Sequence, residues 1–249
     1  MNEIIRSIKQ RKSCRVFLDK AVAPEVKAEI IDAALQAPSA GNQLLYSIID
    51  ITDQKIKDEL SVLCDTQKFI ATAPMVFIFL ADCRRWYDSY EYARMGCEIR
   101  KPSDADLMLS CSDAVIAAQN TVVAAEALGL NSCYIGDVME NAERVSELLN
   151  LDKYTVPVCM LVYGYPEPSQ QNRKKPERFD KKYIVFENGY RRLTEEEHRE
   201  MFRDRAERTS PAAFDYDAYI DKFYKRKYVS EYALEMERSG KIYMDKFHG

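Results

Sequence analysis

The sequence predicts one domain of mixed α and β structure in three layers, followed by a helical C-terminal arm. Helix and strand patterns alternate over residues 1–165, which is typical of a sheet covered by helices on both faces. Beyond Thr194 the composition changes to charged, tyrosine-rich helix with little aliphatic content. We therefore expect a domain at residues 1–190 and an extension at 191–249 that packs on this domain or on a partner subunit.

Start and stop signals place the elements of the first half. Asn2 can cap a helix over residues 3–10, which carries three isoleucines on one face. Pro24 suits the first turn of a second helix, which must end before Pro38 because proline disfavours the α conformation of the residue before it. The other elements expected here are a strand at 45–51, a helix at 54–63 capped by Asp53, and a strand at 75–81 that is apolar throughout and so buried on both faces.

The strongest helix pattern of the chain is residues 113–128. They are mostly alanine and aliphatic on nearly every side and are followed by Gly129, a common C-terminal residue of helices. A helix this apolar is expected to be enclosed, either in a core or in a subunit seam. The other expected elements are a helical excursion or lid at 84–101, a strand at 132–135, a helix at 141–149 capped by Asn141, and a strand at 158–163.

Charge and cysteine content limit the location and the partners. A net charge of -4 and a pI near 5.5 argue against a general affinity for nucleic acid or for anionic membranes. Seven cysteines without a C-x-x-C pair, behind an N-terminus that is amphipathic rather than signal-like, predict a soluble cytoplasmic protein with free thiols. No apolar run approaches the ~18 residues that a membrane span needs.

The positions of the histidines exclude several kinds of active site. His198 and His248 both lie in the C-terminal quarter, so residues 1–190 contain no histidine. This argues against a Ser-His or Cys-His nucleophile and against a zinc site built with histidine. The dense carboxylates, Asp104 with Asp106 and residues 195–197, are explained by the preference for negative charge at helix N-termini. No metal site is expected.

The first candidate site is a cluster of cations around a hydroxyl, just after the first helix. Arg11, Lys12 and Arg15 surround Ser13. By composition alone, the cluster could be ordinary solvated surface. Arginine can bind phosphate oxygens through two nitrogens while serine adds a short neutral hydrogen bond, and this combination favours a phosphate site.

Two further segments are candidates for the same site. Residues 173–182 form a second basic cluster, which could be an ordinary charged loop or could reach the phosphate held by the first. Gly136 follows the strand at 132–135, and a residue without Cβ would let a flat ring approach the chain, although a single glycine there is also a common turn signal. The chain contains neither G-x-G-x-x-G nor G-x-x-x-x-G-K-[ST], so a Rossmann site or a P-loop is not supported.

Taken in order, these motifs resemble the FMN-dependent nitroreductase / flavin reductase family over about residues 3–180. The resemblance implies an α+β fold, a nitroreductase-like three-layer sandwich with a mixed sheet flanked by helices and an extended helical C-terminal arm. It also implies that residues 1–190 are the FMN-binding domain. The motifs that carry the resemblance are Arg11-x-Ser13-x-Arg15-x-Phe17, Ala37-Pro38-Ser39-Ala40-Gly41-Asn42, Glu126-Ala127-Leu128-Gly129-Leu130, Tyr134-Ile135-Gly136, Gly164-Tyr165-Pro166 and Lys175-Pro176-x-Arg178.

The resemblance implies a homodimer with FMN bound where the subunits meet. Reaction takes place at flavin N5, so no side chain is expected to be catalytic. The chain departs from many members at Leu44, where they have glutamine. The implied FMN-binding residues are Arg11, Lys12, Ser13, Arg15, Lys175 and Arg178 for the phosphate and ribityl chain, Ser39 and Asn42 of the other subunit for the ring, Gln67 for a further flavin contact, and Tyr134, Ile135 and Gly136 behind the isoalloxazine.

The implied activity is NAD(P)H-dependent reduction of nitroaromatic, quinone or flavin acceptors by ping-pong hydride transfer, with NADH or NADPH as electron donor. One alternative is a flavoenzyme of the same fold and other chemistry, a reductive dehalogenase or a flavin-fragmenting enzyme. Another is a non-catalytic flavin-binding sensor whose basic, tyrosine-rich tail grips nucleic acid. Acidic residues are interleaved throughout that tail, which favours a solvated dimer arm and no nucleic acid partner.

Overall fold

The computed structural model describes residues 2–209 and 213–248, and the chain forms two compact units. Unit 1 comprises Met1–Arg173 and Glu235–Gly249, and unit 2 comprises Lys174–Leu234.

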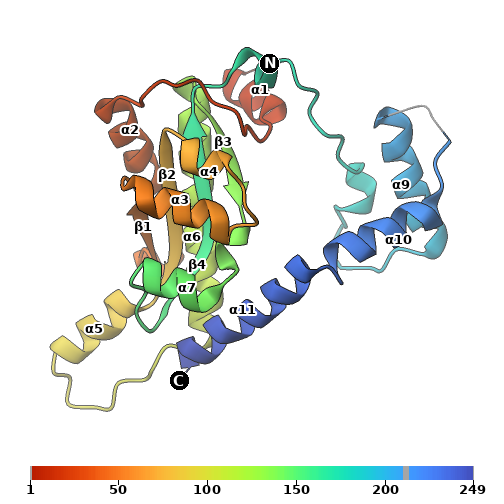
Figure 1. Cartoon of the computed structure of the whole chain (residues 1–249). Helices are drawn as coiled ribbons and strands as arrows, with labels where there is room; N and C mark the ends of the chain where they lie inside the picture. Colours follow the sequence, from red (N-terminus) through yellow and green to blue (C-terminus); the bar gives the residue numbers. More distant parts are fainter. Residues whose placement is uncertain (1, 210–212, 249) are drawn as a thin grey trace. The chain divides into compact units, whose positions relative to one another are not determined.

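Unit 1 is built on a four-stranded sheet with the strand order β1-β2-β4-β3 (Figure 1). All three neighbouring pairs are antiparallel, so the expected mixed sheet is wrong for the described strands, although the α+β class is confirmed. The helical connections from β1 to β2 and from β3 to β4 return to the end of the sheet that they left, and no crossover creates a parallel pair. The strands are β1 Tyr46–Asp50, β2 Met75–Asp82, β3 Asn131–Ile135 and β4 Thr155–Gly164.

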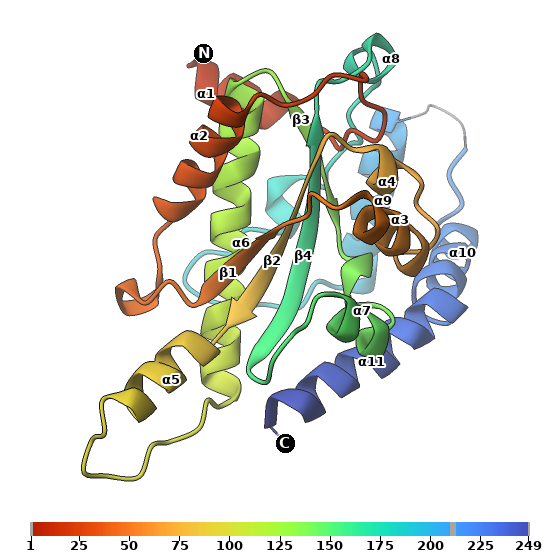
Figure 2. The same cartoon turned by 60° about the vertical axis from the view of Figure 1, so that its left-hand side comes forward.

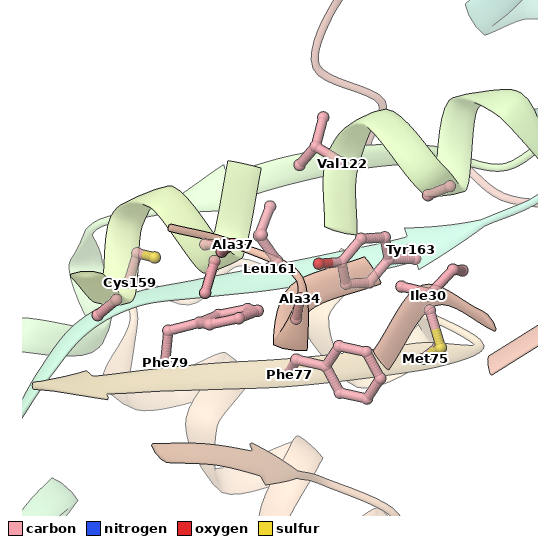
Figure 3. Close-up of a cluster of buried hydrophobic side chains, with 14 of the residues drawn as sticks. Ile30, Ala34, Ala37, Met75, Phe77, Phe79, Val122, Cys159, Leu161 and Tyr163 are labelled. Carbon is pink, nitrogen blue, oxygen red and sulfur yellow. The ribbon is translucent and has the colours of Figure 1, made fainter. Parts of the chain in front are cut away.

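Helices cover both faces of this sheet, which confirms the three expected layers (Figure 2). Every residue of β2 is buried, and its side chains point alternately to the two faces. Phe77 and Phe79 join the cluster with α2 and α6 (Figure 3), whereas Val76 and Ile78 join the cluster under α3, α4 and α7. The helices of unit 1 outside the C-terminal segment are α1 Glu3–Gln10, α2 Pro24–Leu35, η1 Ala40–Asn42, α3 Gln54–Leu63, α4 Phe69–Thr72, α5 Arg84–Tyr92, α6 Asp104–Ala127, η2 Asp137–Met139, α7 Ala142–Leu148 and α8 Pro168–Gln171.

The expected caps of the first and third helices are confirmed. The Asn2 side chain accepts a hydrogen bond from the Ile4 amide at 2.9 Å, and Asp53 accepts one from Lys55 at 2.7 Å. Each satisfies one of the backbone donors that a helix leaves unpaired at its N-terminus.

The long helix α6 begins nine residues earlier than the pattern predicted. Its N-terminus is a capping box in which the Ser103 amide and hydroxyl donate to the Asp106 carboxylate, at 2.8 and 2.7 Å. The charge of Asp106 therefore serves the helix start, as expected. The prediction that this helix is enclosed holds for one side only, since Met108 and Val115 are 71% and 44% exposed.

By length and hydropathy, α6 is long and apolar enough to cross a membrane, which corrects the expectation that no such segment exists. This is weak support for a span, because the core helix of a soluble protein passes the same test. Four alanines of α6 pack in the core against the sheet and α2: Ala114, Ala117, Ala118 and Ala125.

The C-terminal helix α11, Glu231–His248, supplies the cap of α7. The Ser239 hydroxyl accepts from the Ala142 amide at 3.0 Å, and the Glu235 carboxylate accepts from the Asn141 amide at 2.9 Å. Asn141 stands at the expected N-cap position, but its side chain donates to the Leu63 carbonyl instead of capping the helix. The predicted capping role of Asn141 is therefore wrong, because α11 already provides the acceptors.

Unit 2 contains a small core of aromatic rings around one arginine. The Arg205 guanidinium lies 4.2 Å from the centre of the Phe179 ring and 5.1 Å from that of Phe202, and it donates to the Tyr219 hydroxyl at 2.9 Å. Stacking of a cation on aromatic faces adds to the limited apolar contact that so short a segment can make. The helices of unit 2 are η3 Lys181–Tyr183, α9 Glu195–Thr209 and α10 Tyr216–Lys227.

Candidate functional site

The segment after α1 is fixed to the sheet where β4 ends and β3 begins. Phe17 forms an isolated bridge with Pro166, and the Cys14 amide donates to the Ser132 carbonyl at 2.9 Å. A Cβ on Gly164 would lie 2.8 Å from the Phe17 ring, so only glycine allows this close approach. The motifs at 11–17 and 164–166, which are distant in sequence, are therefore one structural feature.

Three cationic side chains, Arg11, Lys12 and Arg15, lie on this anchored segment, and Arg173 is hydrogen-bonded to it. The Arg173 guanidinium donates to the Ser13 carbonyl, and the Lys12 ammonium donates to the Arg173 carbonyl at 2.6 Å. Cys133 lies beneath them, 1% exposed, and burial raises the pKa of its thiol. The groups that oppose this rise, in decreasing order, are Arg15, the Ser13 hydroxyl, Arg11 and Arg173, so all four act on the surroundings of this thiol.

The guanidinium of Arg11 carries unsatisfied donors. Its carbon lies 5.8 Å from the centre of the Tyr134 ring. Its Nε and Nη2 atoms are buried, and neither has a hydrogen-bond acceptor among the residues that the structure describes. Buried nitrogen donors are almost always paired. Arg11 is therefore ready to bind an anion that the chain itself does not supply.

Gln67 and Gly136 line the adjoining surface. The Gln67 amide nitrogen donates to the Asp137 carboxylate at 2.9 Å, which ties the turn before α4 to the residue that follows Gly136. Arg15 lies over the Phe69 ring, 5.8 Å from its centre. A Cβ added to Gly136 would meet no atom within 4 Å. The backbone after β3 is thus open to a flat ligand beside the cations.

The loop with Ser39 and Asn42 belongs to a different end of the sheet. The buried Asp113 carboxylate accepts from the Ser39 hydroxyl at 2.7 Å and from the backbone amides of Ala40 and Leu45 at 3.0 and 3.2 Å. The Ser39 oxygen also accepts from the Leu44 amide at 2.6 Å. Ser39 therefore holds the shape of the loop, while Asn42 is exposed.

The strand register measures the separation between the loop and the cations. Tyr46, which follows the loop, lies in the row of Val156, whereas Ser132, which binds the cationic segment, lies in the row of Tyr163. At ~3.3 Å per residue the two rows are roughly 20 Å apart along β4. β1 and β3 are also the opposite edges of the sheet. The loop and the cationic segment are therefore well separated within a single chain.

The predicted site residues therefore fall into three groups. One group is brought together in unit 1, and within it Ile135 is buried in the core and offers only its backbone. Ser39 and Asn42 form a second group at the far end of unit 1. Lys175 and Arg178 lie in unit 2, so their part in the site stays a prediction. The residues brought together are Arg11, Lys12, Ser13, Arg15, Gln67, Tyr134, Ile135 and Gly136.

Sequence reasoning missed several residues that shape the site. The sequence shows Arg173 only as a member of a basic cluster and does not reveal its bond to Ser13. It shows Asp113 only as a residue of the apolar helix and does not reveal its bonds to the loop. Asp137 gave no signal beyond its place after Gly136, because its partner Gln67 is 70 residues away. A buried aspartate in an apolar helix could have been found, since a charge in such a place must be paired.

Among residues 2–209 and 213–248, no group of three or more His, Cys, Asp and Glu side chains is placed to hold a metal ion.

A model of the nitroreductase family matches residues 8–165. The chain belongs to this family. It is 32% identical over 190 residues to an FMN reductase (NADPH) of Bacillus subtilis, with 76% of this chain and 75% of the relative covered. It is 33% identical to an oxygen-insensitive NADPH nitroreductase of Salmonella typhimurium, with 78% of each covered. The structure of NfrA2 from B. megaterium matches with a TM-score of 0.78 at 30% identity, covering 96% of this chain and 98% of that one.

The cationic end of unit 1 fits the phosphate group of FMN. The unpaired buried nitrogens of Arg11 supply donors, Arg15 and Arg173 supply further charge, and the open backbone at Gly136 leaves room for a ring. The fit to a phosphate therefore rests on residues of unit 1.

Proposed function

We propose that this nitroreductase family member is an FMN-containing, NAD(P)H-dependent oxidoreductase that reduces nitroaromatic, quinone or flavin acceptors. The observation that carries the proposal is the state of the Arg11 guanidinium. Two of its nitrogens are buried without an acceptor among the described residues, and the backbone at Gly136 is open to a ligand. Relatives named FMN reductase and NADPH nitroreductase, at 32% and 33% identity, support the same assignment.

The residues of the chain bind and orient the cofactor. Arg11, Arg15 and Ser13 hold the phosphate, with Lys12 and Arg173 fixing this segment in place. Each charge-assisted hydrogen bond contributes about 1.5–3 kcal/mol, which is enough in sum to retain the cofactor. FMN, when bound, supplies hydride acceptance and donation at its ring N5. The chain then needs no histidine as acid or base.

In this proposal the backbone at Tyr134 to Gly136 would lie behind the ring of the cofactor, and Gln67 would contact the flavin. We place NAD(P)H and the acceptor in turn on the other side, in one shared pocket, which gives ping-pong kinetics. Lys175 and Arg178 add charge at the phosphate in this proposal. The extension at residues 191–249 belongs to the same assembly, packing on its own domain or on the partner.

We further propose a homodimer with a site at the subunit interface. The supporting observation is the separation of roughly 20 Å between the loop with Asn42 and the cationic segment, which a second copy would bridge. Ser39 and Asn42 of that copy would then meet the ring. A cytoplasmic location accords with the seven free cysteines.

The test is the purified protein itself. We expect visible flavin absorption bands, release of FMN rather than FAD on denaturation, and bleaching of the bands when NADH or NADPH is added without oxygen in a stopped-flow instrument. A flavin that neither donor reduces would favour the flavin-binding sensor. Colourless protein that does not bind added FMN would overturn the proposal.

A further inference from the structure

The turn that presents Gln67 is conformationally unusual. Asp65 and Thr66, directly before it, both have left-handed backbone angles, with φ of 57° and 53°. This conformation is uncommon for non-glycine residues and most unfavourable for a β-branched residue such as threonine. Such residues persist where the surrounding contacts impose them, often at functional sites. The position of Gln67 is therefore imposed by its neighbours.

Both hydrogens of the Gln67 side-chain amide are already used. The Nε2 atom donates to the Cys64 carbonyl at 2.9 Å and to the Asp137 carboxylate at 2.9 Å. Both partners accept hydrogen bonds, so the orientation with nitrogen inward is the one that satisfies them. The Oε1 atom remains as the polar atom of Gln67 that can meet a ligand, and an oxygen of this kind only accepts.

Asp137 is in turn held by Glu140, three residues later. Glu140 is 6% exposed, and burial together with Asp137, Asp65 and Glu235 raises its pKa to about 7. The hydrogen bond of its side chain with Asp137 acts in the same direction. The Glu140 amide also donates to the Asp137 carbonyl at 3.0 Å, and this contact helps to fix Asp137 where it accepts from Gln67.

We propose that Asp137 and Glu140 form a positioning pair that holds the Gln67 amide with its oxygen toward the bound ligand, so that the site selects a ring edge carrying an N–H donor. The inference rests on the proposed function and extends it, because the isoalloxazine ring of oxidised FMN has one such donor, N3–H. Asp137 and Glu140 are positioning residues, and Gln67 makes the contact.

Loss of Asp137 removes one of the two acceptors that hold the amide nitrogen inward, and the Cys64 carbonyl remains as the other. The flipped orientation of Gln67, which presents its NH₂ group, then becomes less unfavourable. Selection of an N–H over a methylated nitrogen should weaken. Asp137→Asn retains an oxygen that accepts from Gln67, so this variant preserves the selection.

Ligand selection is measured by titrating FMN-free protein with FMN and with FMN methylated at N3. The parent and Asp137→Asn should bind FMN about 10-fold more tightly than the methylated form, the value of about one hydrogen bond. Asp137→Ala should prefer FMN by a clearly smaller factor than the parent does. Equal preference in the parent and in Asp137→Ala, or no preference in the parent, overturns the inference.

A second measurement needs no flavin and so separates this inference from the proposed function. The side-chain amide protons of Gln67, assigned by the loss of their NMR signals in Gln67→Ala, should exchange with solvent about 10-fold faster in Asp137→Ala than in the parent or in Asp137→Asn. Equal exchange rates contradict the positioning role even if FMN binds. Slow exchange in the parent without FMN binding contradicts the proposed function alone.

Discussion

Glu140 is a buried acid among other acids. It is 6% exposed, and its Oε1 atom has no hydrogen-bond partner in the described part of the chain. Burial is the largest cause that raises its pKa, to about 7, and Asp137, Asp65 and Glu235 follow. Ionisation of Glu140 therefore lowers the free energy of unfolding, because its negative charge is buried and lies near other carboxylates.

Glu140→Gln should therefore stabilise unit 1 at high pH. The folded pKa lies above the unfolded value of ~4.3, so the folded state binds more protons between these values and the stability of the parent falls as the pH rises through this window. The variant keeps a donor for Asp137 but cannot ionise. Its advantage in free energy of unfolding should grow from near zero at acid pH to at most about 4 kcal/mol above neutrality.

Urea unfolding of parent and variant at several pH values between 5 and 8 measures this difference. The exposed Glu98 offers a matched control, and Glu98→Gln should leave the pH dependence of the parent unchanged. A stability difference between Glu140→Gln and the parent that does not vary with pH would contradict the prediction.

At this scale the sequence predicts residues whose chemistry is visible locally and misses those that act through distant partners. Arg11, Ser13 and Arg15 lie within five positions, so their shared charge and hydroxyl indicate an anion site. Asp137 and Glu140 acquire their roles because the turn before α4 reaches the end of β3. No pattern within either segment encodes that contact.

At the scale of elements, α5 holds the loop that leads into β1. The Arg85 guanidinium donates to the Leu44 carbonyl at 2.9 Å, to the Tyr46 carbonyl at 3.2 Å and to the Ser47 hydroxyl at 2.9 Å. The Trp86 indole donates to the Gln43 carbonyl at 2.7 Å. Through these hydrogen bonds, α5 holds the C-terminal side of the loop that carries Asn42.

Arg85→Ala should loosen this loop. Gly41, Asn42 and Leu44 all have positive φ, and the contacts of Arg85 help to offset the unfavourable conformation at the two residues that are not glycine. Loss of about 1–2 kcal/mol of local stability should accelerate amide hydrogen exchange at Leu44 to Tyr46 about 10-fold. Arg84→Ala is the matched control, since Arg84 pairs with Asp88 on the same helix instead. Equal exchange in the two variants would show that α5 does not hold the loop.

The elements themselves were predicted where their signals are local. The apolar run of β2 and the caps Asn2 and Asp53 are confirmed, because burial on both faces and capping are read from a few neighbouring residues. The alanine pattern placed the start of α6 nine residues too late, because alanines are a stronger helix signal than the cap, although the carboxylates of Asp104 and Asp106 were already assigned to a helix N-terminus. The capping role of Asn141 was wrong because α11, about 100 residues away, supplies the acceptors.

At the scale of the whole molecule, one face of α6 is left without a cover in unit 1. Met108, Leu109, Val115 and Ile116 are all exposed, at 39% to 71%. They form two adjacent pairs spaced seven residues apart, about two helical turns, so they share one side of the helix. Such an apolar stripe accords with a second copy of the chain packing on it, as the proposed homodimer requires.

The shared site can be tested by combining two defective chains. Arg11→Ala should weaken FMN binding by about 10-fold or more, because a buried charge-assisted contact is lost, and we expect a comparable loss for Asn42→Ala. If each site takes its cations from one subunit and its loop from the other, a heterodimer of the two variants contains one site with both changes and one site with neither. Co-expression with two different affinity tags isolates this heterodimer.

We expect the heterodimer to bind one FMN per dimer with the affinity of the parent, as measured by flavin fluorescence titration. The control is a heterodimer of Arg11→Ala with Arg15→Ala, whose changes fall on the same segment. There each site carries one defect, and no site of parental affinity should appear. If the Arg11→Ala and Asn42→Ala heterodimer also lacks such a site, the loop and the cations do not meet on one ligand across the interface.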